Sequence, residues 1–395
     1  MMKTIHRLLS LIACLVLLYI GVTGTLIQVL DLSVLLRHAP ETNETMQSIN
    51  EGRFGNPPYA IVTRADFGPA TLPAGLDYGK AFTTVVQAAH QQKPDAKPDF
   101  VELRNVGGAT VGQLQFGKEV LAFDAATGAP VKAVSLTSAK PPKSLRQTIK
   151  QWHRFWGPDY FSHRDKPGVY FEFGFGLVLW AMIISGLVMY WNLWSARAKM
   201  DRKQLFWSAG GIWRTLHRVV SLASAVLLIA VAASGTWIGF ESSYHTFQGR
   251  PQRVKPALLS DSDVVKMSAQ TLAVMRRTEP QTPIKVLRVR EYAGYRQGVV
   301  VTGGATTEQR VFDLATGRSL SLKEPRYPSS GFPLGIQTHE DVKHFHGGFM
   351  FGLPARFLDL LAGLSLIFLS VSGATMYLQL WLKRRKNGRG AFVWL

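Results

Sequence analysis

Histidine is the residue type in this chain whose spacing points most directly to chemistry. Seven of the ten histidines precede long apolar segments, and they fall into three groups. Neutral imidazole ligates haem iron and first-row metal ions, so each group is a candidate ligand set. The groups are His6 with His217, His153 with His163, and His339 with His344 and His346.

His6 and His217 occupy equivalent places in a repeat. HRLLSLIACLVLLYIGVTGTLI begins at His6, and HRVVSLASAVLLIAVAASGTWI begins at His217, with no gap between the two. Two further matches follow in the same order. SGLVMYWNLW at Ser185 resembles SGATMYLQLW at Ser372, and LAFDAATGAPV resembles RVFDLATGRSL. We therefore predict an internal duplication whose halves each read span, outer segment, span. Each half returns the chain to the same side, so the repeat is parallel, about an axis normal to the membrane.

A parallel repeat brings equivalent residues to face each other across its axis. This predicts His6 and His217 as axial partners of one haem near the inner membrane surface. One histidine before span two and one before span four would hold a second haem near the outer surface. We favour His153 over His163 and His346 over His344 for that pair. A zinc site at His339, His344 and His346 is the alternative, although the chain offers no thiolate there.

Small residues in the spans support two haem sites, one near each membrane surface. Ser185-Gly186 and Ser372-Gly373 are expected at the depth of His6 and His217. Gly24 and Gly235 are expected at the depth of the other histidines. Small residues let helices approach closely, and they also leave room for a porphyrin.

Four apolar stretches position these residues, since about 20 apolar helical residues cross a bilayer. The expected fold class is membrane α-helical, with four spans, internal duplication and two small α+β outer domains. Each outer domain should carry one helix on an antiparallel sheet, with D-x-x-T-G as a hairpin turn. The spans are expected at 1–30, 166–194, 215–240 and 351–382, the outer domains at 31–165 and 241–350, the inner loop at 195–214 and the tail at 383–395.

The formal net charge is +19, and the sharpest basic clusters lie beside the spans. Basic clusters precede span one, fill the loop between spans two and three, and follow span four, which by the positive-inside rule makes these regions cytoplasmic. We therefore expect a bacterial inner-membrane protein with both termini inside, in contact with lipid and not with nucleic acid. The single cysteine, Cys14, excludes a disulfide framework or CxxC chemistry within one chain.

The HR-x-x-S-L openings, the approach from His346 to Pro354 and the S-G-x-x-M-Y closings resemble the PepSY-associated transmembrane proteins. The likeness covers nearly the whole chain, and the outer domains look like PepSY modules. It implies b-type haem held by His6, His217 and His346. Iron-regulated members are similar to inner-membrane ferric-siderophore reductases, and this chain most resembles the ferrioxamine type. Before span two, WHRFWGPDYFSHRDKPG departs from the family pattern, which leaves His153 and His163 both open.

The leading hypothesis is therefore an enzyme, a ferric-siderophore reductase with two b-type haems. Electrons would come from quinol or a partner reductase, because no G-x-G-x-x-G follows a strand to hold a nicotinamide or flavin. A haem-free sensor whose outer domains bind a peptide or partner is the alternative. A permease is the third hypothesis, but four spans are few for a monomeric carrier.

Overall fold

A computed structural model describes residues 2–50, 53–55, 59–133, 144–155, 167–248, 257–304, 306–322, 324–327 and 331–392. The chain divides into two compact units, and each is built from segments of both halves of the sequence. One unit contains the long apolar helices and is called the helical unit here. The other contains the strands and is called the sheet unit. The helical unit comprises 1–38, 143–250 and 330–395, and the sheet unit comprises 39–142 and 251–329.

The helical unit contains four helices that are long and apolar enough to cross a membrane. Near-continuous apolar composition, rather than one apolar stripe, is what a lipid-facing helix requires. Two shorter helices lie before the second and fourth spans. The long helices are α1 (Met2–Leu36), α5 (Pro167–Ala198), α7 (Ala225–Gln248) and α10 (Gly352–Lys386), and the short ones are α4 (Leu145–His153) and α9 (Gly335–His346).

The long helices pack in two corresponding pairs. Helix α1 packs along α10, and α7 packs along α5. Glycines make both crossings close: a Cβ at Gly363 would lie 2.5 Å from Thr25 Oγ1, and one at Gly176 would lie 2.3 Å from Thr236 Oγ1. The short helices follow the same scheme, since α4 packs on α1 and α9 packs on α7.

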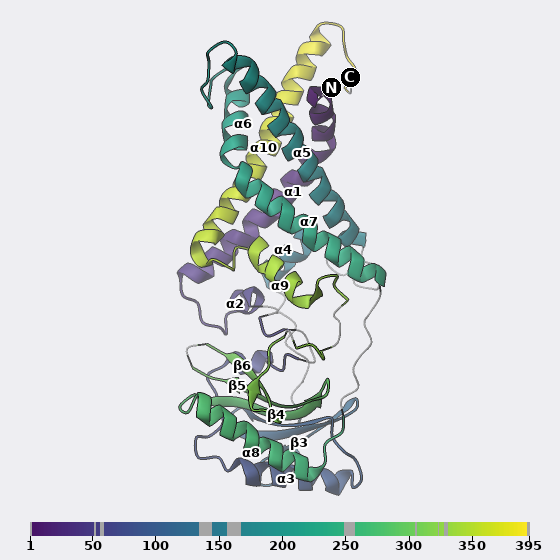
Figure 1. The fold of residues 1–395 in the computed structure, drawn as a ribbon, viewed down its shortest axis with the longest axis vertical. Coiled ribbons are helices and arrows are strands. Elements are labelled where there is room, and N and C mark those ends of the chain that lie inside the picture. Colours follow the sequence, from purple (N-terminus) through teal and green to yellow (C-terminus); the bar gives the residue numbers. More distant parts are fainter. Residues whose placement is uncertain are drawn as a thin grey trace. The chain divides into compact units, whose positions relative to one another are not determined.

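The third span differs from the continuous helix that we expected at 215–240. A preceding helix, α6 (Ile212–Ala223), ends at Ser224, and α7 begins directly after it. The Ser224 hydroxyl donates to the Val220 carbonyl at 2.7 Å, which satisfies a backbone group at the break. His217 lies on α6, which packs against α10 (Figure 1).

We expected two separate α+β outer domains, but the strands of both halves form one sheet. It has seven strands in the order β3-β2-β1-β4-β5-β6-β7. Neighbouring strands in this order run antiparallel. The join is between β1 and β4, where Leu103 lies opposite Leu287. The strands are β1 (Phe100–Val106), β2 (Ala109–Phe116), β3 (Glu119–Asp124), β4 (Ile284–Tyr292), β5 (Tyr295–Thr302), β6 (Glu308–Asp313) and β7 (Arg318–Ser319).

One face of this sheet is apolar and is covered by two helices, α3 (Tyr78–Gln92) and α8 (Asp261–Thr278) (Figure 1). Side chains alternate between faces along a strand, so Val101 and Leu103 of β1 join Phe82 of α3 in the core. Asp77 caps α3, and Ser260 forms a capping box with α8. Each half therefore contributes one helix and one set of strands to a common core.

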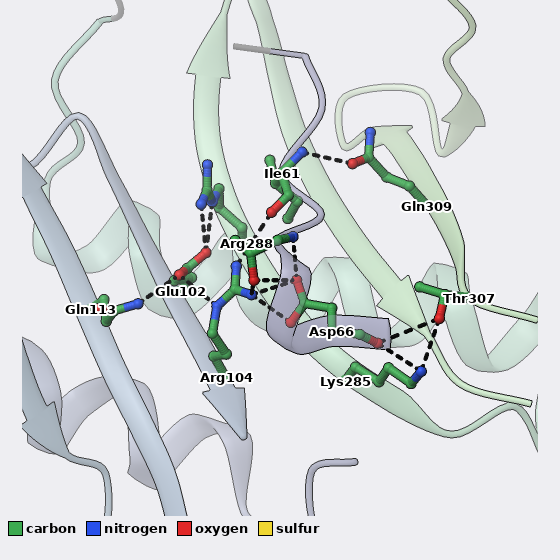
Figure 2. Close-up of polar contacts among 10 residues, drawn as sticks. Ile61, Asp66, Glu102, Arg104, Gln113, Lys285, Arg288, Thr307 and Gln309 are labelled. Carbon is green, nitrogen blue, oxygen red and sulfur yellow. Dashed lines mark hydrogen bonds and ion pairs between the residues drawn. The ribbon is translucent and has the colours of Figure 1, made fainter. Parts of the chain in front are cut away.

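The opposite face of the sheet is buried too, and where β1 meets β4 it carries charged side chains. Glu102 of β1 accepts from Arg104 and Arg288, and Arg104 also pairs with Asp66 of the short helix η1 (Arg64–Phe67) (Figure 2). Glu102 and Arg104 have no solvent exposure. Because Lys285 donates to the Asp66 carbonyl at 2.8 Å, this cluster also joins β4 to the segment that contains η1.

The expected D-x-x-T-G hairpin turns are confirmed. Asp124 accepts from the backbone N–H of Thr127 at 2.8 Å, and Asp313 accepts from that of Ala315 at 3.2 Å. The glycine that closes the first turn has φ of +73°, a left-handed conformation that glycine adopts without strain.

Candidate functional site

The first turns of α1 and helix α6 lie toward the end of the helical unit where N and C are marked (Figure 1), and they carry His6 and His217. His6 Nδ1 is 2.7 Å from the hydroxyl of Ser185 on α5, and His217 Nδ1 is 2.7 Å from that of Ser372 on α10. The two imidazoles are close enough for a charge on one to act on the other. We call His6 and His217 the terminal pair.

A second pair repeats this arrangement further along the helices. His153, the last residue of α4, has Nδ1 2.9 Å from the Thr23 hydroxyl on α1. His346, the last residue of α9, has Nδ1 2.9 Å from the Ser234 hydroxyl on α7. These two imidazoles also interact electrostatically. We call His153 and His346 the connector pair.

The hydroxyl groups set the proton position on each ring. A serine or threonine hydroxyl has one hydrogen, and here it is directed to a backbone carbonyl. The acceptors lie one turn earlier on the same helix: Ala181 for Ser185, Leu369 for Ser372, Tyr19 for Thr23 and Ala230 for Ser234. A hydroxyl hydrogen directed to the carbonyl leaves the oxygen to accept from the imidazole Nδ1–H, and in that tautomer the Nε2 lone pair can ligate a metal.

A glycine follows each of these hydroxyl residues and faces the imidazole. A Cβ at Gly235 would lie 3.1 Å from His346 Cε1, and one at Gly24 would lie 3.3 Å from His153 Cε1. At the terminal pair the clearances are larger, 3.6 Å at Gly186 and 3.8 Å at Gly373. The missing side chain therefore lets each ring lie against the helix backbone, most tightly at the connector pair.

The two pairs are far apart along the bundle. The helix between His6 and Thr23 rises about 26 Å at 1.5 Å per residue, close to the thickness of a hydrocarbon core. On α4 and α9, outside the spans, burial lowers the pKa of His346 to about 4, and burial together with the neighbouring His346 lowers the pKa of His153 to about 3. Both imidazoles are therefore neutral at pH 7, the form that ligates a metal.

The other candidate histidines are placed differently. His163 lies outside the described residues. His344 faces Phe349, with ring centroids 5.7 Å apart, so it is His346 that meets the hydroxyl-glycine step. His339 belongs to neither histidine pair. Its Nδ1 lies 3.0 Å from the Glu241 carboxylate on α7. In the described ranges, no group of three or more His, Cys, Asp or Glu side chains gathers as a metal site, so the geometry gives no support to the zinc alternative.

Sequence reasoning missed two features of this site. Thr23 and Ser234 were not singled out, although a hydroxyl residue precedes glycine in all four spans and that dipeptide was the available signal. The buried ion cluster of Asp31, Arg146 and Arg356 was also missed. Asp31 pairs with both guanidinium groups, and all three residues are at most 4% exposed. The cluster joins α1, α4 and α10 and thereby positions His153 and the start of α10.

These elements define a class of protein, a multi-pass membrane protein with a separate α+β unit. The family is established by comparison. The model of the PepSY-associated TM region matches residues 3–380, and the chain belongs to this family. No curated protein matches the chain.

Proposed function

We propose that the protein is a haem-containing oxidoreductase of the inner membrane, which passes electrons across the bilayer to reduce a periplasmic ferric siderophore. One observation carries the proposal: four imidazoles are arranged in two pairs, and each ring has its Nδ1 2.7–2.9 Å from a serine or threonine hydroxyl. Paired neutral imidazoles are the usual axial ligands of a low-spin electron-transfer haem.

The described residues fit haem of the b type. A b-type haem is bound without covalent links, whereas a c-type haem needs C-x-x-C-H, and this chain has one cysteine. When bound, the haems would supply two one-electron centres. The terminal pair would hold one near the cytoplasmic face, and the connector pair would hold the other near the periplasmic face.

The role of the surrounding residues follows from the geometry. The hydroxyls of Ser185, Ser372, Thr23 and Ser234 would fix the ring orientation and the tautomer of each ligand. Because a hydroxyl is a neutral acceptor, it leaves the imidazole less electron-rich than a carboxylate partner would.

The duplication, the PepSY-like outer modules and the orientation belong to the same proposal. The recurrence of the same histidine contacts in the two halves of the chain supports a duplication, and the basic clusters beside the spans support cytoplasmic termini. The ferric siderophore rests on the family resemblance. Reduction of iron(III) to iron(II) weakens its binding by hard oxygen ligands, so electron delivery would release the iron.

The test is the absorption spectrum of purified protein, oxidised and dithionite-reduced, with haem measured as pyridine haemochrome. We expect two b-type haems per chain and the loss of one each in His6→Ala and His346→Ala. His90→Ala is the matched control, because His90 lies in the sheet unit and pairs with Asp261. Haem-free protein from cells well supplied with haem would reject the proposal in favour of a sensor that binds a peptide or partner.

Reduction of a ferric siderophore is tested separately. Protein reduced with dithionite and freed of reductant should reoxidise when ferrioxamine is added, while an iron(II) trap such as ferrozine gains colour. If the haem stays reduced in the presence of the chelate, the protein is an electron carrier whose acceptor is not this ferric siderophore.

A further inference from the structure

The loop between α5 and α6 folds back along the end of α5. Trp194 Nε1 donates to the Lys203 carbonyl at 3.4 Å. One turn earlier on α5, the Tyr190 hydroxyl donates to the Leu205 carbonyl at 2.8 Å. The loop therefore runs antiparallel to the helix, back toward the span that it has just left. It lies toward the end of the helical unit where N and C are marked (Figure 1).

The same contacts recur after the fourth span. Trp381 Nε1 donates to the Gly390 carbonyl at 3.3 Å, and the Tyr377 hydroxyl donates to the Phe392 carbonyl. The bonded residues are 9 and 15 apart in the sequence in both places. This fold-back is therefore a defined structural element and not a chance conformation of one loop.

Two arginines from different helices meet at the indole of Trp207, near the end of this loop. The Arg197 guanidinium carbon lies 4.7 Å from the ring centroid, and that of Arg218 lies 4.2 Å from it. Trp207 is 8% exposed and also contacts Tyr190, with ring centroids 5.6 Å apart. The buried indole thus holds a cation of α5 and a cation of α6 at one place. We call Arg197, Trp207 and Arg218 the Trp207 site.

The two guanidinium groups of this site differ in what they bind. Arg218 donates to the carbonyls of Trp207 at 2.8 Å and Ala209 at 3.2 Å, and it thereby fixes the loop. Arg197 Nε is buried and has no hydrogen-bond partner among the described residues. The positive charges of Arg197 and Arg218 repel each other. An anion that accepts from Arg197 would satisfy the buried donor and relieve this repulsion.

Exposed apolar side chains accompany the Trp207 site. Leu205, Phe206 and Ile212 are 56%, 51% and 70% exposed. Asp201 is the single acidic residue of the loop at 199–211, and its partner is Lys203. A basic segment with exposed apolar side chains beside a span is typical of a surface that contacts anionic lipid.

We propose that the Trp207 site binds the phosphate group of an anionic phospholipid, whose acyl chains cover Leu205 and Phe206. The planar guanidinium of Arg197 presents paired N–H groups that match two phosphate oxygens. The fold-back brings Leu205 toward the span, where the acyl chains of a bound lipid would lie. The site contains none of the four paired histidines, so the proposal is independent of haem.

The test uses the full-length protein in nonionic detergent and a phosphatidylglycerol that carries a diazirine on one acyl chain. We expect light-induced label on peptides of 199–211, with competition by unlabelled phosphatidylglycerol and none by inorganic phosphate. Arg197→Gln should reduce the labelling about tenfold. Lys199→Gln is the matched control, because it removes the same charge from an exposed position of the same loop, and its labelling should stay within about twofold.

Thermal unfolding in detergent separates lost binding from lost folding. Without lipid, Arg197→Gln should unfold at the same midpoint as the unmodified protein. Added phosphatidylglycerol should raise the midpoint of the unmodified protein and of Lys199→Gln, but not that of Arg197→Gln.

Equal loss of label in Arg197→Gln and Lys199→Gln would overturn the proposal, because the net charge of the loop would then explain the binding. Competition by phosphatidylcholine as strong as that by phosphatidylglycerol would also overturn it, since the site would not select an anionic lipid. Displacement of the label by inorganic phosphate would assign the site to a soluble anion instead.

Discussion

At the scale of single residues, the repeated unit of the site is a hydroxyl, a glycine and an imidazole. The helix that supplies the hydroxyl also supplies the glycine against which the imidazole lies, because the hydroxyl residue and the glycine are consecutive in the sequence. A hydroxyl that already donates to its own helix can only accept from the ring. The same few atoms thus fix the position, the orientation and the tautomer of each histidine without burying a charge.

Removal of one hydroxyl should therefore affect haem more than it affects the fold. Ser234→Ala deletes the acceptor of the His346 Nδ1–H, a hydrogen bond worth about 1 kcal/mol to folding. Outer-shell partners of metal-bound histidine typically change metal affinity by about 10- to 100-fold. We expect a similar loss in haem affinity, measured by haem transfer to apomyoglobin, and a shifted midpoint potential.

The control is Ser10→Ala on α1, where the hydroxyl donates only to the Arg7 carbonyl in the described contacts. Its haem affinity should equal that of the unmodified protein. Equal haem loss from the Ser10 and Ser234 variants would mean that the hydroxyl next to His346 has no specific role.

Much of this local chemistry could be predicted from the sequence. The repeat identified His6 and His217, and the structure places both beside the Ser-Gly steps expected at their depth. The partners Thr23 and Ser234 were not predicted, because the side of a helix that faces α4 or α9 depends on how those short helices dock. The sequence favoured His346 over His344, and the docking of α9 decides between them, because the two lie only two residues apart.

At the scale of the elements, the buried ion cluster of Asp31, Arg146 and Arg356 is the main polar link between helices. Arg146 Nη2 donates to Asp31 at 3.0 Å, and Arg356 packs on the Phe349 ring, 3.6 Å from its centroid. Because one carboxylate pairs with two guanidinium groups, its loss removes an ion-pair partner from both buried cations.

Asp31→Asn should consequently destabilise the helical unit more than Arg146→Met does. Breaking a buried ion pair costs about 3–5 kcal/mol when an unpaired charge is left behind. After Arg146→Met, Asp31 still has Arg356. We expect the midpoint of thermal unfolding in detergent to fall for both variants, and to fall further for Asp31→Asn.

Asp341→Asn, an exposed position on α9, provides the baseline and should leave the midpoint unchanged. The reverse order, with Arg146→Met the more harmful, would show that packing of the long side chain, and not charge compensation by Asp31, dominates at this site.

The shared sheet could not be predicted from the sequence. Each half encodes one helix and a set of alternating strands, and this pattern is complete within either half. The contact between β1 and β4 joins residues that are far apart in the chain, such as Leu103 and Leu287. Pairing of this kind depends on which strand edges meet in three dimensions, and hydrophobic periodicity carries no information about it.

At the scale of the whole molecule, acid should weaken the sheet unit. Burial raises the pKa of Glu102, but the Arg104 and Arg288 guanidinium groups outweigh it and lower the pKa from 4.5 to about 2. A lowered folded-state pKa contributes stability that is fully present above the unfolded-state value. That contribution is lost as the pH falls toward 2.

We expect amide hydrogen exchange of β1 and β4, corrected for intrinsic rates, to accelerate between about pH 4.5 and pH 2. Glu102→Gln should exchange faster at neutral pH and show little further change in acid. Glu119→Gln, on the exposed end of β3, is the control and should follow the unmodified protein. Identical acid sensitivity in the Glu102 variant would exclude this carboxylate as the cause.

The join between β1 and β4 has a consequence for biosynthesis. Two spans are synthesised between these strands, so the ribosome completes β1 long before β4 exists. Until then the edge of β1 that will face β4 is unpaired, and such edges invite pairing with other chains. The sheet can be completed only after β4 has been synthesised, and β4 follows α7 in the chain. Folding of the sheet unit therefore depends on correct membrane insertion of α7, although α7 belongs to the helical unit. Translation stalled between the two halves should therefore leave the first sheet segment exposed to protease, even though all of its own residues have been made.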